Sequence, residues 1–195
     1  MLTVEDAIPL PPLYSEIKQK SEAITFNMLS DLRTGSLLRT LAAAKPQGNF
    51  LELGTGTGLS LTWLAAGADA NTTLLSIDNE ASYQQVAINA FANDKRITFI
   101  CTDGNEWLKT YQGPLFDLIF ADAWPGKFNG LDETLALVKV GGFYMIDDLL
   151  PQPNWPAGHP EKVEALLATL KQKENFVFTI LDWSTGLMVF TKIKN

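Results

Sequence analysis

The spacing of hydrophobic positions changes near residue 49, and this change predicts two differently built regions. Between residues 14 and 44 the apolar side chains recur three or four positions apart, which is helical spacing. We predict two helices there, with a break near Thr34 and Gly35, because glycine interrupts helices. The segment before residue 14 contains three prolines, which exclude a continuous helix.

From residue 49 onward, short apolar runs alternate with helical segments. This alternation predicts a parallel α/β sheet, and the almost continuous apolar character of the runs predicts helices on both faces. Two later runs are separated by only 184–186, which is too short for a helical crossover, so they predict an antiparallel hairpin. The expected strands are 50–53, 73–77, 97–101, 116–121, 142–146, 176–183 and 187–193, and the expected helices are about 59–68, 80–93, 104–111, 129–139 and 160–174.

Composition and charge restrict the classes of protein to which the chain can belong. The chain has 195 residues, of which 46% are apolar and 19% are charged, and this balance is typical of one globular domain. We expect a single domain over 1–195, with an N-terminal helical cap at 1–45 and a sheet core at 46–195. The formal net charge is -7, so nucleic acid is not expected as a partner.

The apolar runs and the cysteine content indicate the compartment. No apolar run approaches the roughly 20 residues that span a bilayer. Residues 1–12 carry two acidic and no basic side chains, unlike a signal peptide. Cys101 is the only cysteine, so neither a disulfide within the chain nor a thiolate metal cluster can form. We therefore expect a cytoplasmic protein with no membrane association.

A glycine-rich turn follows the first expected strand and opens the next helix. Starting at Glu52, it reads E-x-G-x-G-x-G through Gly54, Gly56 and Gly58, whereas dinucleotide-binding turns read G-x-G-x-x-G. Glycines permit the tight turn and let a ligand approach the backbone. This spacing favours an S-adenosylmethionine (SAM) site. The N–H groups of the following helix and the Ser60 hydroxyl could then bind the methionine carboxylate.

Polar side chains also follow the next two expected strands. Asp78, with Asn79 after it, stands where a carboxylate can accept hydrogen bonds from both ribose hydroxyls. Asp103, Gly104 and Asn105 stand where the adenine ring is expected, and the Asp103 carboxylate can accept from its exocyclic amine. Because parallel strands end at one edge of the sheet, these residues would share one cofactor site. Each acid alone could equally be a solvated helix cap.

A parallel sheet that finishes in an antiparallel strand resembles the seven-stranded, Rossmann-like sheet of class I SAM methyltransferases. The resemblance is closer to the catechol-type, metal-dependent O-methyltransferases of small molecules, and it covers the chain from Met28 to about Pro160. It rests on Met28, Gly35, the LELG motif at 51–54 and the FADAW motif at 120–124. By this resemblance, Met28 would belong to the cofactor site.

The same resemblance implies a metal centre. Asp122, Asp147 and Asp148 would bind a divalent cation, Mg²⁺ or Mn²⁺, and Trp124 would lie against the adenine. Asp122 would also contact the cofactor and take part in catalysis. Carboxylate oxygens suit such cations, and a bound cation would lower the pKa of an acceptor hydroxyl. The family has Asn where this chain has Asp148, and the three acids could instead cap helices or bind loop amides.

The general base is where the chain departs from the family pattern. In the family, a catalytic lysine directly follows the aromatic residue, and Pro125 stands there in this chain. Lys127 can replace that lysine only if the chain bends back at Gly126. We expect His159 to start a helix, from which it could also reach the substrate. Trp155 either walls the acceptor pocket or anchors its loop.

Together these features predict an enzyme that uses SAM to methylate a hydroxyl of a small molecule, with the help of a divalent cation. Two alternatives stay open: a metal-independent small-molecule methyltransferase, and a non-catalytic protein that binds SAM or its product S-adenosylhomocysteine (SAH). The chain has little room for a separate substrate domain. Specificity would therefore come from the N-terminal helices, the 149–159 loop or a partner subunit of a homo-oligomer.

Overall fold

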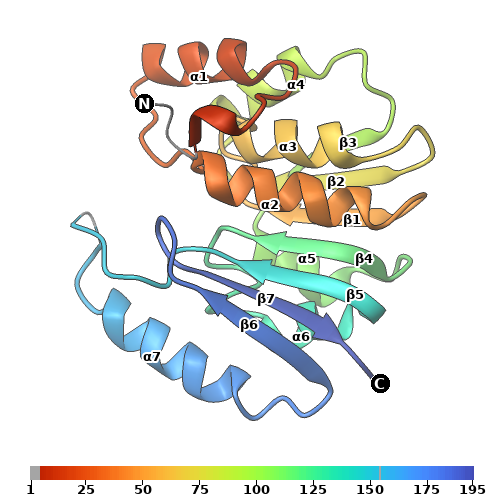
Figure 1. Cartoon of the computed structure of the whole chain (residues 1–195), viewed down its shortest axis with the longest axis vertical. Coiled ribbons are helices and arrows are strands. Elements are labelled where there is room, and N and C mark those ends of the chain that lie inside the picture. Colours follow the sequence, from red (N-terminus) through yellow and green to blue (C-terminus); the bar gives the residue numbers. More distant parts are fainter. Residues whose placement is uncertain (1–4, 154) are drawn as a thin grey trace.

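A seven-stranded mixed sheet forms the centre of the protein, whose computed structural model describes residues 5–153 and 155–195 (Figure 1). The strands are β1 (Asn49–Leu53), β2 (Thr73–Asp78), β3 (Ile97–Cys101), β4 (Phe116–Ala121), β5 (Val138–Ile146), β6 (Phe176–Leu181) and β7 (Leu187–Lys192). Their order in the sheet is β3-β2-β1-β4-β5-β7-β6. The first five strands pair in parallel, whereas β7 is antiparallel to both β5 and β6. The predicted parallel sheet with a final antiparallel hairpin is confirmed.

A helix connects each pair of consecutive strands from β1 to β6, as the sequence predicted, and the remaining helices precede β1. The helices are η1 (Glu5–Ala7), α1 (Tyr14–Ala23), α2 (Leu32–Ala43), α3 (Leu59–Gly67), α4 (Ala81–Ala90), α5 (Gly104–Thr110), α6 (Leu131–Ala136) and α7 (His159–Leu170). The proline-containing segment before α1 is not a continuous helix over its described part, and residues 1–4 lie outside the described residues. No helix in the described part of the chain has the length and apolar character needed to cross a membrane.

The break between the two N-terminal helices lies at 24–31, so the predicted position near Thr34 and Gly35 is wrong. Helix α2 begins after Asp31, whose carboxylate accepts hydrogen bonds from two backbone N–H groups of the first turn. Such a cap fixes where a helix starts. Gly35 lies inside α2, and a Cβ there would come within 2.3 Å of the Trp63 indole nitrogen. This glycine therefore permits close packing of α2 on α3 and does not end a helix.

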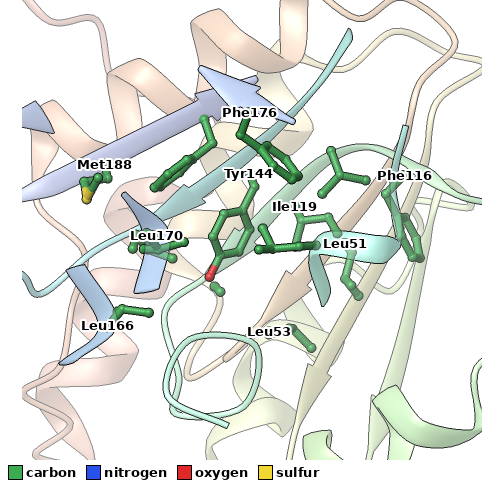
Figure 2. Packing of buried hydrophobic residues seen from close by; sticks show 14 of the residues in the cluster. Leu51, Leu53, Phe116, Ile119, Tyr144, Leu166, Leu170, Phe176 and Met188 are labelled. Atoms are coloured by element: carbon green, nitrogen blue, oxygen red, sulfur yellow. The ribbon is translucent and has the colours of Figure 1, made fainter. Parts of the chain in front are cut away.

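Two clusters of buried apolar side chains cover the two faces of the sheet. On one face, α5, α6 and α7 pack against residues such as Leu51, Ile119 and Tyr144 (Figure 2). On the opposite face, α1, α2 and α3 pack against residues such as Phe50 and Leu118. Successive residues of a strand point to opposite faces. The central strands are therefore apolar at almost every position.

Tyr144 connects the first cluster to the loop that follows β4. Its ring is fully buried among the side chains of the cluster (Figure 2). Its hydroxyl donates a hydrogen bond of 2.6 Å to the carbonyl of Gly126. Burial raises the pKa of Tyr144, so the hydroxyl keeps its proton and remains a donor. The core thereby holds the loop that carries Lys127.

Candidate active site

A cleft of about 770 Å³ lies at the carboxyl ends of the parallel strands. This volume suits a cofactor or a drug-sized ligand. The cleft is lined by every predicted cofactor contact except Glu52, namely Met28, Gly54, Gly56, Ser60, Asp78, Asn79, Asp103, Gly104, Asn105, Asp122 and Trp124. Lys127, Asp147, Asp148 and His159 line the same cleft. The fold thus brings the predicted cofactor, acid and base residues together.

Glu52 is the exception, because its side chain is fully buried beneath the glycine turn. One carboxylate oxygen accepts a hydrogen bond of 2.6 Å from Ser60, and the other accepts one of 2.5 Å from Ser76. Burial raises the pKa of Glu52 to about 7, although both hydroxyl donors oppose this rise. We therefore correct its role from ligand contact to support of the turn. The Ser60 hydroxyl donates its single proton to Glu52. Ser60 could therefore donate a hydrogen bond to a cofactor carboxylate only after this hydroxyl rotates away from Glu52.

The glycine turn adopts a backbone that other residues rarely adopt. Gly54, Gly56 and Gly58 have φ angles of 104°, 49° and 92°, which lie in the region that glycine enters without steric cost. A Cβ on Gly58 would come within 2.6 Å of the Ala87 methyl group. The N–H of Gly56 donates to a carboxylate oxygen of Asp78 at 2.7 Å, so Asp78 both lines the cleft and stabilises the turn.

The end of the cleft near α5 contains a polar atom without a partner. Asp103 caps α5 by accepting from the backbone N–H of Asn105 at 2.7 Å. The side-chain oxygen of Asn105 is buried, and no residue in the described ranges donates a hydrogen bond to it. An unsatisfied buried acceptor costs about 1–3 kcal/mol. A ligand that donates at this point, such as the amine of adenine, would remove that cost.

The loop after β4 bends back on itself and buries Lys127. The carbonyl of Trp124 accepts three N–H groups of residues 127–129, at 2.9–3.2 Å. Gly126 has a φ angle of 83°, and a Cβ there would come within 2.3 Å of a β1 side chain. The Lys127 side chain is 2% exposed, and its Nζ donates to the backbone carbonyl of Asp147 at 3.0 Å. Lys127 could reach the cleft only if the chain bent back at Gly126, and the structure contains this bend.

Two carboxyl groups of the cleft lie near Lys127, that of the buried Asp147 and that of the half-buried Asp122. Burial raises the pKa of Asp122 well above its usual value; the negative charge of Asp147 adds to this rise and the charge of Lys127 opposes it. Burial also raises the pKa of Asp147 to about 6. One carboxylate oxygen of Asp147 accepts hydrogen bonds from the Thr185 hydroxyl and from the backbone N–H of Asp148. The β6–β7 turn, which carries Thr185, thus closes one side of the cleft.

The acids do not fit a divalent cation in their present arrangement. Within residues 5–153 and 155–195, no group of three or more His, Cys, Asp or Glu side chains is placed to hold a metal ion. The oxygens of Asp147 already accept from Thr34, Thr185 and the backbone of Asp148. The ammonium group of Lys127 already places a positive charge near Asp122. The metal site implied by the resemblance stays a prediction.

Two of the aromatic rings near Lys127, those of Trp124 and His159, line the cleft. Trp124 is 45% exposed, and the Lys162 ammonium lies 4.5 Å from the centre of its ring. His159 starts α7, as the sequence predicted, and its side chain is 5% exposed. The centre of its ring lies 4.4 Å from that of Trp155 and 5.1 Å from that of Phe128. Trp124 and His159 line the cleft, whereas Phe128 and Trp155 pack against the His159 ring at interplanar angles of 85° and 41°.

Sequence reasoning missed several residues of the cleft. Phe26 and Tyr83 both line it and contact each other edge to face, with ring centres 4.8 Å apart. A Cβ on Gly56 would come within 2.9 Å of the Phe26 ring. Thr185 also lines the cleft. These contacts join segments far apart in the chain, so no local spacing could reveal them.

The order of the strands, the glycine turn after β1 and the cleft at the carboxyl edge define a Rossmann-like fold of the class I SAM methyltransferase type. A family model described as O-methyltransferase matches residues 9–176. The chain therefore belongs to this O-methyltransferase family, and the resemblance inferred from its motifs is confirmed.

Individual relatives agree with this assignment. A protein of Mycolicibacterium vanbaalenii named "Putative O-methyltransferase" is 31% identical over 117 residues, which are 57% of this chain and 52% of that protein. The chain thus spans about half the length of the curated relatives it matches.

Solved structures share the fold over nearly the whole chain. TomG of Streptomyces achromogenes, an O-methyltransferase involved in tomaymycin synthesis and solved with SAM, has a TM-score of 0.84 and 20% identity; the match covers 96% of this chain and 92% of that one. An O-methyltransferase of Bacillus cereus, solved with SAH, has a TM-score of 0.81 and 18% identity, covering 95% and 93%. At these identities the likeness shows the fold alone.

Proposed function

We propose that the protein is an enzyme that uses SAM to methylate a hydroxyl group of a small molecule. The observation that carries this proposal is the cleft, which joins the glycine turn, Asp78 and Asn105 at one end to Lys127 at the other. Membership of the O-methyltransferase family supports it. So do the SAM and SAH bound to the structural neighbours from Streptomyces and Bacillus.

The cofactor half of the cleft fits SAM by the chemistry of its polar atoms. The Asp78 carboxylate lines the cleft and can accept hydrogen bonds from ribose hydroxyls, which strengthen when the acceptor is charged. The unpartnered oxygen of Asn105 can accept from the adenine amine. The glycines of the turn present backbone without a Cβ to the ligand. When bound, SAM supplies a methyl group on a positively charged sulfur.

The acceptor would bind in the half of the cleft that contains Lys127. There we assign to Lys127 the removal of the proton from the acceptor hydroxyl. A hydroxyl is a weak nucleophile, and a positioned base that removes its proton commonly accelerates such a reaction about 10²- to 10⁴-fold. The Asp147 carbonyl and the bend at Gly126 hold the Lys127 side chain in a single place. In its neutral form the amine can take the proton, and in its charged form it stabilises the resulting oxyanion.

A metal-independent reaction is the second candidate, and the Lys127 ammonium near Asp122 favours it. This charge already balances part of the acidic cluster that a cation would otherwise neutralise. Turnover after exhaustive chelation, followed by addition of Mg²⁺ or Mn²⁺, distinguishes the two candidates. Unchanged turnover supports the metal-independent reaction, and loss with recovery on metal addition supports the catechol-type reaction.

Binding and turnover together test the proposal. Calorimetry with SAM and SAH should show saturable binding to the purified protein. A screen of hydroxylated small molecules, with SAM labelled in its methyl group, should show label on at least one acceptor. Binding without any transfer would support the non-catalytic alternative. Absence of binding would refute the proposal.

A further inference from the structure

Ser60 stands where the glycine turn meets α3, and its hydroxyl has two competing uses. The residue lines the cleft although it is only 4% exposed. Helix α3 begins after Gly58 without a side-chain cap, and the first N–H groups of a helix have no partner within the helix. The carboxylate of a bound cofactor is the anion expected at this helix start. In the structure, however, Ser60 donates its proton to Glu52 at 2.6 Å.

The second donor to Glu52 is fixed by a chain of hydrogen bonds. Ser76 donates to the other carboxylate oxygen at 2.5 Å. Because this bond uses its only proton, Ser76 accepts from the Thr55 hydroxyl, which lies 2.7 Å away. The side-chain amide of Gln84 in turn donates to Thr55 at 3.0 Å. Ser76 therefore cannot turn without breaking this chain, whereas Ser60 can turn toward the cleft.

Negative charges act on Glu52 from two neighbouring elements. Burial raises the pKa of Glu52 to about 7, the two serine hydroxyls oppose this rise, and the charge of Asp78 at the end of β2 adds to it. The charge of Glu52 also acts on Asp122, which follows β4. Helix α3 contributes no charged side chain. Near neutral pH, the loss of one hydrogen-bond donor is therefore enough to decide whether Glu52 carries a proton.

Rotation of Ser60 toward a cofactor carboxylate changes the preferred state of Glu52. It leaves one oxygen of a fully buried carboxylate without its donor, which strongly disfavours the charged form. A proton taken from solvent relieves this. The protonated carboxyl group can then donate to the Ser60 oxygen while Ser60 donates to the cofactor, and Ser76 still donates to the second oxygen of Glu52. All three side chains thus keep hydrogen-bond partners.

We propose that Glu52 is a positioning residue of the cofactor site, which takes up a proton when Ser60 turns to bind the carboxylate of SAM or SAH. Binding of the cofactor and binding of this proton then strengthen each other by the same factor. The protein should consequently bind SAH more tightly on the acid side of neutral pH than on the alkaline side. This inference rests on the proposed function, because it concerns how the same cofactor site holds its ligand.

Calorimetry of SAH binding at pH 8 measures this proton directly. SAH is the probe because its sulfur carries no charge, and titrations in buffers with different enthalpies of ionisation give the number of protons taken up per bound SAH. With a pKa of about 7, about one free molecule in ten holds the proton at this pH. Loss of a hydrogen bond to a charged group favours the protonated form about tenfold, so the expected uptake is about 0.4 proton.

Three variants identify the group that takes up the proton. Glu52→Gln has no titratable group at this position, so it should lose this uptake, and Ser60→Ala should lose it because the coupling hydroxyl is absent. Glu164→Gln makes the same chemical change on an exposed face of α7 and should keep the uptake. Uptake that remains in Glu52→Gln belongs to other groups, such as the amine of SAH, and is subtracted. The unmodified protein should bind SAH about fivefold more weakly at pH 8 than at pH 6, and Glu52→Gln should not show this change.

Difference infrared spectra recorded with and without SAH at pH 8 provide a second readout. The C=O stretching band of a protonated carboxyl group should increase when SAH binds to the unmodified protein, and it should not increase in Glu52→Gln. Release of protons, no uptake, equal uptake in the unmodified protein and Glu52→Gln, or uptake that persists in Ser60→Ala overturns the inference. Failure of the unmodified protein to bind SAH would instead overturn the proposed function.

Discussion

Replacement of Glu52 by Gln should make the protein more stable at neutral and alkaline pH. The carboxyl group is fully buried, and among the described residues only the hydroxyls of Ser60 and Ser76 donate to it. An amide has nearly the same shape and can bond to both hydroxyls after they rotate. The substitution therefore removes the buried charge without creating a cavity.

The magnitude follows from the pKa of this group. Burial raises the pKa of Glu52 from 4.5 to about 7, so the folded state holds the proton more tightly than the unfolded state. The stabilisation from this proton is complete below pH 4.5 and is lost as the pH rises through about 7. A difference of one unit between two pKa values corresponds to about 1.4 kcal/mol, so the loss is about 3 kcal/mol. Glu52→Gln should not show this loss.

Urea unfolding of both proteins between about pH 4 and about pH 8 measures the effect. The free energies of unfolding should be similar near pH 4, and the variant should become the more stable protein by about 3 kcal/mol near pH 8. Glu164→Gln makes the same chemical change on an exposed face of α7 and should show no such dependence on pH. A stability difference between Glu52→Gln and the unmodified protein that does not change with pH would refute the reasoning.

Four further substitutions test the site. Asp78→Ala should weaken SAM binding measured by calorimetry by about 100-fold or more, because two hydrogen bonds to the charged carboxylate are lost and each is worth about 1.5–3 kcal/mol; unchanged affinity would remove Asp78 from the ribose site. Lys127→Ala should lower kcat by about 10²- to 10⁴-fold with SAM affinity nearly unchanged, and His159→Ala should lower kcat much less; the reverse order would make the 149–159 loop the catalytic element. Tyr144→Phe should cost about 1–3 kcal/mol in urea unfolding, because the carbonyl of Gly126 loses its 2.6 Å donor; an unchanged midpoint would show that this bond does not hold the loop.

Features encoded by neighbouring residues could be predicted from the sequence. The strands follow from short apolar runs, and the final hairpin follows from a gap of three residues. The glycine turn and Asp78 could be placed at one edge because parallel strands end there. The bend at Gly126 could be anticipated because glycine permits a positive φ angle, which the structure shows to be 83°.

Features that depend on distant contacts could not be predicted. Gly35 reads as a helix break in sequence, but it is required where α2 packs on Trp63. Glu52 belongs to the glycine motif, yet its side chain points to the face where Ser60 and Ser76 donate to it. The contact of Thr185 with Asp147 joins residues 38 positions apart. Such contacts appear only when the sheet and its helices are assembled.

Methyl transfer from SAM labelled in its methyl group tests the central claim most directly. The reaction is run with a set of hydroxylated small molecules, some of which carry a carboxylate, and the products are separated and identified. The account predicts label on a hydroxyl oxygen of an acceptor, with transfer about 10²- to 10⁴-fold slower in Lys127→Ala. Label on no acceptor, or transfer that proceeds equally well without Lys127, would contradict it.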